Sequence, residues 1–144
     1  MTDQDHYRKL ERMYLAAPVN EYFAPSIQID EGKAEVGIEV RPDFFHAANA
    51  AHGYLYFKVL DDSAFFATNS LVADVFVLTV SFNLHFTRPV SKGVMKATAQ
   101  VVHRSKRLFI AEGVALDSRG REVGRGSGTF MRSDIRLTPE VGYV

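Results

Sequence analysis

The sequence has no cysteine among its 144 residues. Disulfide bonds, thiolate metal sites and cysteine nucleophiles are therefore excluded. It also has no excess of either charge, because 17 lysine and arginine residues balance 17 aspartate and glutamate residues. A balanced chain lacks the bulk electrostatic attraction that draws proteins to nucleic acids and charged membranes, so we expect neither as a partner.

Long apolar runs are missing as well. Every apolar stretch is far shorter than the roughly 20 residues of a membrane-spanning helix. The first residues, Met1–Asp5, are polar and acidic, unlike a signal peptide, so we expect a cytoplasmic protein. Five scattered histidines without a spaced pair predict no metal site. The length fits one domain over residues 1–144, with a core of about 5–133 and an irregular tail over 134–144.

Hydrophobic periodicity in the first third of the chain predicts a helix and a hairpin. Apolar residues at helical spacing indicate a helix over residues 4–16, capped by Asp3 or Asp5 and ended by Pro18. Alternating residues on both sides of a Glu-Gly turn then predict a hairpin of strands 26–30 and 33–40, followed by a loop over 42–51.

The remainder predicts one long helix and then a sheet. The helix covers about residues 54–71, and four antiparallel strands follow it over 76–88, 94–104, 108–117 and 121–132. One sheet with a helix against one face is an α+β architecture. Its exposed edges favour oligomerisation.

The predicted long helix is apolar on nearly every side, yet it carries Asp61 and Asp62 at its midpoint. A helix of this kind is normally buried, and burial of an ionised carboxylate is costly unless the group is paired or functional. Lys58 precedes Asp62 by one turn and can pair with it. Asp61 has no such local cation, so we expect a raised pKa and take Asp61 as the catalytic candidate.

His52-Gly53 opens this helix, and Asp61 follows nine residues after the histidine. Further along are Asn69-Ser70 and a Phe-Thr-Arg-Pro sequence at 86–89. In these motifs and in the order of its elements over about 5–133, the chain resembles the hotdog-fold acyl-CoA thioesterases of the PaaI-like, phenylacetate-degradation type. Three positions depart from the family pattern: His46 stands for an amide residue, and Asn49 and Tyr54 stand for glycines.

The resemblance implies a hotdog fold, in which an antiparallel sheet wraps around a long central helix. It implies hydrolysis of an acyl-CoA to a carboxylic acid and free CoA, with CoA as part of the substrate and no cofactor. The first N–H groups of a helix have no internal partner and carry partial positive charge. The N–H of Gly53 or its neighbour would therefore polarise the thioester carbonyl. Asp61 would act as general base or as nucleophile.

The spacing between Gly53 and Asp61 indicates how many chains form the site. Gly53 and Asp61 are eight residues apart, or roughly 12 Å along a helix axis, so one carbonyl carbon cannot contact both. In the family the two groups come from two protomers. We therefore expect a homodimer with two shared sites, and a dimer of dimers as the higher assembly.

Several other side chains have two interpretations. His52 is either a catalytic base or a cap of the helix. His46 either hydrogen-bonds the water or the thioester sulfur, a role that Asn49 could fill instead, or is a surface histidine. Thr79 either assists the water, as a hydroxyl at this position does in some relatives, or is an ordinary strand residue. By alternation, Asn83 and His85 would share the face of Thr79, which leaves the same choice for them.

Candidate substrate contacts are basic or aromatic. Arg88, Arg104 and Lys106 could bind the phosphates of CoA. The alternative is that Arg104 and Lys106 are part of a solvated hairpin turn and that Arg88 is likewise a solvated charge. Tyr54 and Phe65 belong to an aromatic group near the helix that either allows an aryl or medium-length acyl group or is mostly part of the core. Two other functions remain. One is a hotdog protein that binds acyl-CoA without hydrolysing it, and the other is a hotdog dehydratase, for which no matching loop is found.

Overall fold

The computed structural model describes residues 1–144. Its elements are α1 (Asp3–Ala16), α2 (Pro18–Phe23), β1 (Ser26–Asp30), β2 (Lys33–Glu39), the 3-10 turn η1 (Pro42–Phe44), α3 (Gly53–Asn69), β3 (Val75–Phe86), β4 (Val94–Arg104), β5 (Leu108–Leu116), β6 (Glu122–Arg136) and the 3-10 turn η2 (Pro139–Val141). None of the helices is long and apolar enough to cross a membrane.

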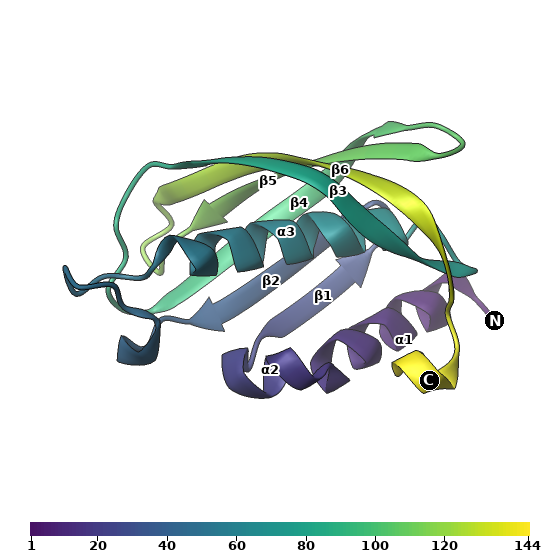
Figure 1. The fold of residues 1–144 in the computed structure, drawn as a ribbon, viewed down its shortest axis with the longest axis horizontal. Helices are drawn as coiled ribbons and strands as arrows, with labels where there is room; N and C mark the ends of the chain where they lie inside the picture. Colours follow the sequence, from purple (N-terminus) through teal and green to yellow (C-terminus); the bar gives the residue numbers. More distant parts are fainter.

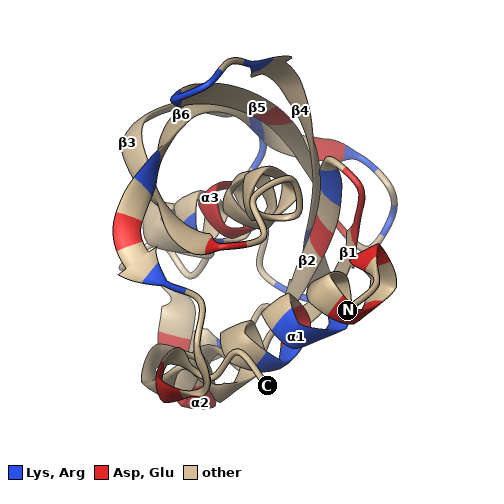
Figure 2. Ribbon diagram, turned by 90° about the vertical axis from the view of Figure 1, so that its right-hand side faces the viewer, with Lys and Arg blue, Asp and Glu red and all other residues tan.

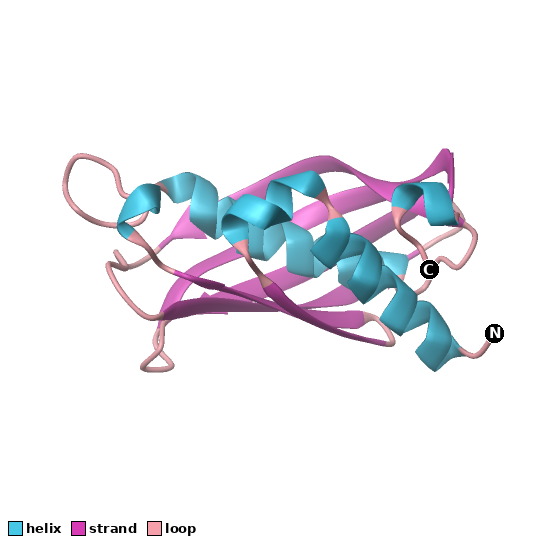
Figure 3. Ribbon diagram, turned by 90° about the horizontal axis from the view of Figure 1, so that it is seen from below, coloured by secondary structure: helices cyan, strands magenta, loops and turns pink.

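All six strands form one antiparallel sheet in the order β1-β2-β4-β5-β6-β3. The sheet curls around α3, which lies inside the curl (Figures 1 and 2). Helices α1 and α2 and the C-terminal segment lie on the open side of the curl, so the helices gather on one side of the strands (Figure 3). The predicted α+β class and the hotdog arrangement are confirmed.

The start and end of α1 differ from the prediction. Thr2 is the N-cap, and it forms a capping box with Asp5, whose N–H donates to the Thr2 hydroxyl over 3.1 Å. Asp3 and Asp5 lie in the first turn of the helix and are not the cap. Pro18 begins α2 at its first position, where a missing N–H costs nothing. The sequence does not predict the short helix α2, because the same proline that ends one helix begins the next.

The strands lie where alternation predicts them, within a few residues at the ends. The tail is the exception, because β6 continues to Arg136 and η2 follows it. Residues 134–144 are therefore not wholly irregular. Inside the curl, the Phe82 ring lies where Cβ atoms on Gly126 and Gly128 of β6 would be, at 2.5 and 2.6 Å. The alternating glycines of β6 therefore allow the two strands and the Phe82 ring to pack closely.

Only part of α3 is buried. Leu55, Val59 and Leu60 are fully buried against the sheet. Phe57 is 42% exposed, and Asp61, one turn later, is only partly buried. The prediction that the helix is buried on nearly every side is therefore wrong within a single chain. An apolar stripe of α3 that contains Phe57 and the carboxylate of Asp61 remains uncovered.

Candidate active site

Asp61 lies at the middle of α3, facing the edge strand β3. The hydroxyl of Thr79 donates a hydrogen bond to Asp61 Oδ1 over 2.9 Å, so the structure brings these two predicted residues together. Burial is the main cause that raises the pKa of Asp61, to about 6, against the lowering effect of the Thr79 hydrogen bond. Asp62 raises that pKa further and Lys58 lowers it. A carboxyl group with this pKa can gain and lose a proton near neutral pH.

Asp62 has the partner that its spacing predicts. Lys58 Nζ lies 2.7 Å from Asp62 Oδ2, and both side chains are about 15% exposed. The Tyr14 hydroxyl also donates to Asp62 Oδ2, over 2.5 Å. Tyr14 is not predicted from the sequence, because its contact with Asp62 joins residues 48 positions apart. Asp62 is therefore held by a cation and a hydroxyl, whereas Asp61 keeps one oxygen without a partner in the chain.

A cavity of about 830 Å³, here called the Asp61 cavity, opens beside this carboxylate. It contains Asp61, Thr79 and Phe65 of the predicted site. Side chains of α1, α2, α3 and β3 form its walls together with the C-terminal segment. Gly53 does not line it.

The N-terminus of α3 lies in separate surroundings. His52 is the N-cap, and its Nδ1 accepts the Tyr54 N–H over 3.1 Å, while the Leu55 N–H donates to the His52 carbonyl over 3.0 Å. The contacts of His52 are therefore those of a helix cap. The Gly53 N–H has no acceptor within the chain, so of these first N–H groups it is the one available to a ligand.

A second cavity, of about 460 Å³, opens at Gly53 and is here called the Gly53 cavity. His46 and Arg88 line it, together with Phe86, whose ring would be 3.0 Å from a Cβ added to Gly53. A side chain at position 53 would therefore crowd the ring. The candidate site residues are thus divided between two cavities, with the free N–H in one and the carboxylate in the other.

Two departures from the family pattern have physical explanations. Asn49 has φ 63°, in the left-handed region where glycine and asparagine are best tolerated, so asparagine can replace glycine there. Tyr54 turns toward Phe23 and Phe44, with ring centroids 5.9 and 6.3 Å away, and lines neither cavity. The third, His46, is exposed, and its Nδ1 accepts the Ala48 N–H over 3.0 Å.

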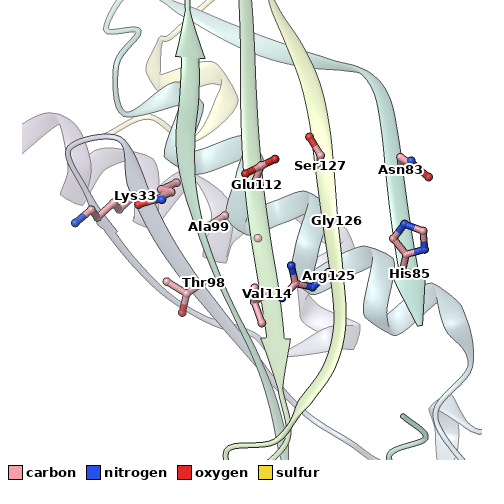
Figure 4. Close-up of a pocket in the computed structure, with 12 residues that line it drawn as sticks. Lys33, Asn83, His85, Thr98, Ala99, Glu112, Val114, Arg125, Gly126 and Ser127 are labelled. Carbon is pink, nitrogen blue, oxygen red and sulfur yellow. The ribbon is translucent and has the colours of Figure 1, made fainter. Parts of the chain in front are cut away.

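Asn83 and His85 do not share the face of Thr79, so that prediction is wrong. The pairing of β3 with β6 shifts by one residue between Thr79 and Ser81, which marks a bulge. An extra residue reverses the alternation beyond it. Asn83 and His85 consequently line a polar hollow of about 490 Å³ on the outer face of the sheet, beside Glu112 and Arg125 (Figure 4).

The predicted phosphate contacts are not all together. Arg104 and Lys106 line a surface cavity of about 870 Å³ with Arg107 and Arg132, at the turn between β4 and β5. Arg88 lies in the Gly53 cavity instead. No three histidine, aspartate or glutamate side chains converge to hold a metal ion.

Comparison with known proteins agrees with this fold. The "Putative esterase Rv1847" of Mycobacterium tuberculosis is 29% identical over 107 residues, which cover 72% of this chain and 76% of that protein. Its solved structure has a TM-score of 0.78 at 23% identity, covering 83% of this chain and 99% of that one. The PaaI protein from the phenylacetic acid degradation operon of E. coli has a TM-score of 0.86 at 21% identity, covering 96% of this chain and all of that one.

These structures share the hotdog fold, which confirms the resemblance predicted from the His52-Gly53 and Asp61 spacing. The model of a protein family described as the thioesterase superfamily matches residues 48–123, a little over half of the chain. The match includes both the free N–H of Gly53 and the carboxylate of Asp61. Membership of this family supports hydrolysis of a thioester in general terms. The chain belongs to the thioesterase superfamily.

Proposed function

We propose that this protein is an acyl-CoA thioesterase that acts as a homodimer, with each active site built from two chains. The observation that carries the proposal is the division of the site between two cavities. Gly53 lies in one, and Asp61 lies in the other, eight residues further along the helix. That spacing is roughly 12 Å along the axis. A second copy that docks with its α3 alongside would bring the Asp61 of one chain to the Gly53 of the other.

The N-terminus of α3 would polarise the substrate. The Gly53 N–H would donate to the thioester oxygen, and the partial positive charge of the helix end favours the negative charge that develops there. Gly53 has no side chain that would crowd the Phe86 ring and narrow the approach to this N–H. Removal of one such donor costs about 100- to 1,000-fold in rate in known hydrolases.

The partner's carboxylate would supply the nucleophile. As a general base, Asp61 takes a proton from water, the hydroxide attacks the carbonyl carbon, the C–S bond breaks, and the proton passes to the CoA sulfur. As a nucleophile, Asp61 attacks the carbonyl carbon and forms an anhydride as the C–S bond breaks and CoA leaves as the thiolate; water then hydrolyses the anhydride, which restores the carboxylate and supplies the proton that the thiolate takes up. Both routes need ionised Asp61 and no cofactor. Thr79 orients the carboxylate in either case.

The phosphates of CoA are anionic and require cations. We propose Arg88 at the Gly53 cavity for the part of CoA nearest the thioester, and Arg104 and Lys106 for a more distant phosphate. His46, which lines the Gly53 cavity, is placed to contact the thioester sulfur or the water.

A panel of acyl-CoA substrates tests the proposal, with release of free thiol as the measurement. Wild type should hydrolyse at least one member, and Asp61→Asn should lose at least 100-fold in kcat, since it removes the base but keeps the shape. Asp62→Asn is the matched control and should retain more activity, because Asp62 is held by Lys58 and Tyr14.

A protein that binds acyl-CoA without hydrolysing it is the second candidate function. The observation that favours it is His46, whose ring lines the Gly53 cavity where the family pattern has an amide. If wild type and Asp61→Asn are equally inactive on every substrate while both bind CoA esters, the binding function replaces the enzymatic one.

A further inference from the structure

The Asp61 cavity is mainly apolar away from the carboxylate. Met13, Ala16 and Val19 line it from α1 and α2, and Val141 lines it from the C-terminal segment. Phe65 and Phe76, whose ring centroids are 5.0 Å apart, line it from α3 and β3. A concave hydrocarbon surface of this kind favours an apolar ligand, because its burial removes apolar area from water.

The cavity has no unpaired cation. Lys58 is the only basic residue in the lining, and it is paired with Asp62 at 2.7 Å and lies 5.0 to 5.2 Å from the rings of Phe23 and Tyr14. The other charged lining residues, Asp61 and Glu140, are acidic. A ligand that ends in a carboxylate would therefore meet negative charge without a free cation.

A buried histidine contacts the C-terminal segment next to the residues that line the cavity. His6 Nδ1 is 2.7 Å from the Tyr143 hydroxyl, and His6 Nε2 is 2.9 Å from the Asn69 carbonyl. His6 is 3% exposed and Tyr143 is 6% exposed. One side chain of α1 thus joins the C-terminal segment to the end of α3. Tyr143 directly follows residues 139–142, which line the cavity, so this contact restrains that part of the wall.

We propose that the Asp61 cavity binds an uncharged, medium-chain acyl group, and that the wall made by Ala16 of α1 and Val141 of the C-terminal segment limits its length. This inference rests on the proposed function, since it places the acyl group of the substrate beside Asp61. It adds the class of acyl group and the residues that select it.

Calorimetric binding of saturated acyl-CoA esters from acetyl to dodecanoyl tests the inference, with Asp61→Asn as the background so that no turnover occurs. The dissociation constant should fall by up to about fourfold per methylene until the chain reaches the wall. Hexanoyl-CoA should bind more tightly than adipoyl-CoA, which has the same length but ends in a carboxylate.

Ala16→Phe, added to that background, should end the gain at a shorter chain, because the new ring occupies the cavity. Leu15→Phe is the matched control, since Leu15 is 50% exposed and does not line the cavity. Val141→Phe should likewise end the gain at a shorter chain, because Val141 lines the cavity from the C-terminal segment. Circular dichroism checks that each variant is folded.

Equal affinity for all chain lengths would overturn the inference, as would a chain-length profile of Ala16→Phe that matches that of Leu15→Phe. The outcome for the proposed function is read separately. Chain-length-dependent binding together with an inactive wild type would refute the thioesterase but support the acyl cavity. Hydrolysis that requires Asp61, with a chain-length profile that Ala16→Phe leaves unchanged, would support the thioesterase but refute the acyl cavity.

Discussion

Asp61 is a carboxyl group with apolar neighbours, and its surroundings have opposing effects on its ionisation. Burial and the neighbouring charge of Asp62 favour the protonated form, whereas the Thr79 hydrogen bond and Lys58 favour the ionised form. The result is a pKa of about 6, which leaves the group mostly ionised at neutral pH. A base of this kind is available for reaction and still able to hold a proton.

The pH dependence of kcat/KM should follow this ionisation. Because the proposed reaction needs ionised Asp61, kcat/KM should be level above about pH 7 and should fall about tenfold per unit below the pKa of about 6. Thr79→Val removes a hydrogen bond that lowers the pKa, so the acid limb should move to higher pH. Initial rates between pH 4.5 and 8.5 provide the measurement.

Ser81→Ala is the control for that experiment, because Ser81 is an exposed residue of the same strand beyond the bulge. Its acid limb should coincide with that of wild type. A profile that is flat across pH 5 to 7 would show that ionisation of Asp61 does not govern the rate.

At the scale of elements, local patterns predict most of the fold. The hairpin, α3 and the four long strands follow from alternation and helical spacing, and the Lys58–Asp62 pair follows from the helical repeat. The contact between Tyr14 and Asp62 could not be predicted, because it depends on how α1 packs against α3.

The bulge in β3 is the clearest limit of the sequence patterns. Alternation carried past residue 80 puts Asn83 and His85 on the face of Thr79, whereas one extra residue turns them outward. Nothing in the local composition marks that residue, since Val80 is a typical strand former. Beyond the bulge, Phe82 packs on the glycines of β6, and this contact depends on the partner strand rather than on the sequence of β3.

Gly126→Ala tests this packing. Its Cβ would lie 2.5 Å from the Phe82 ring and 2.9 Å from the Asn83 carbonyl oxygen, so the strand itself would have to move. Such overpacking costs typically about 1–3 kcal/mol, and each kcal/mol lowers the Tm by about 2–4 °C in a chain of this size. The decrease in Tm is measured by thermal unfolding with circular dichroism.

Ser127→Ala is the control, because it changes the neighbouring outward-facing residue. It should leave the Tm within a degree or so of wild type. Equal unfolding temperatures for the two variants would contradict the role assigned to the close approach.

At the scale of the whole molecule, one edge of the sheet is open. Helix α1 lies beside the β1 edge, whereas β3 pairs only with β6. Exposed apolar residues gather on and near β3: Leu78 and Val80 are 46% and 57% exposed, and Phe86 and Phe57 are 57% and 42% exposed. An exposed apolar edge strand favours pairing with another chain. The edge and the uncovered stripe of α3 are therefore the surface that we propose for the partner.

A mixed dimer tests the shared site directly. Gly53→Val blocks the Gly53 cavity and Asp61→Asn disables the Asp61 cavity, so each variant alone should be inactive. In a mixed dimer of the two, one site combines the intact Gly53 of one chain with the intact Asp61 of the other, and the second site has both changes. With one intact site of two, the isolated mixed dimer should have about half of wild-type activity, and a randomly paired mixture should have about a quarter. Co-expression with two different affinity tags isolates the mixed species, and thiol release measures its rate. If both groups acted within one chain, every chain in the mixture would lack one of them, and no activity would return.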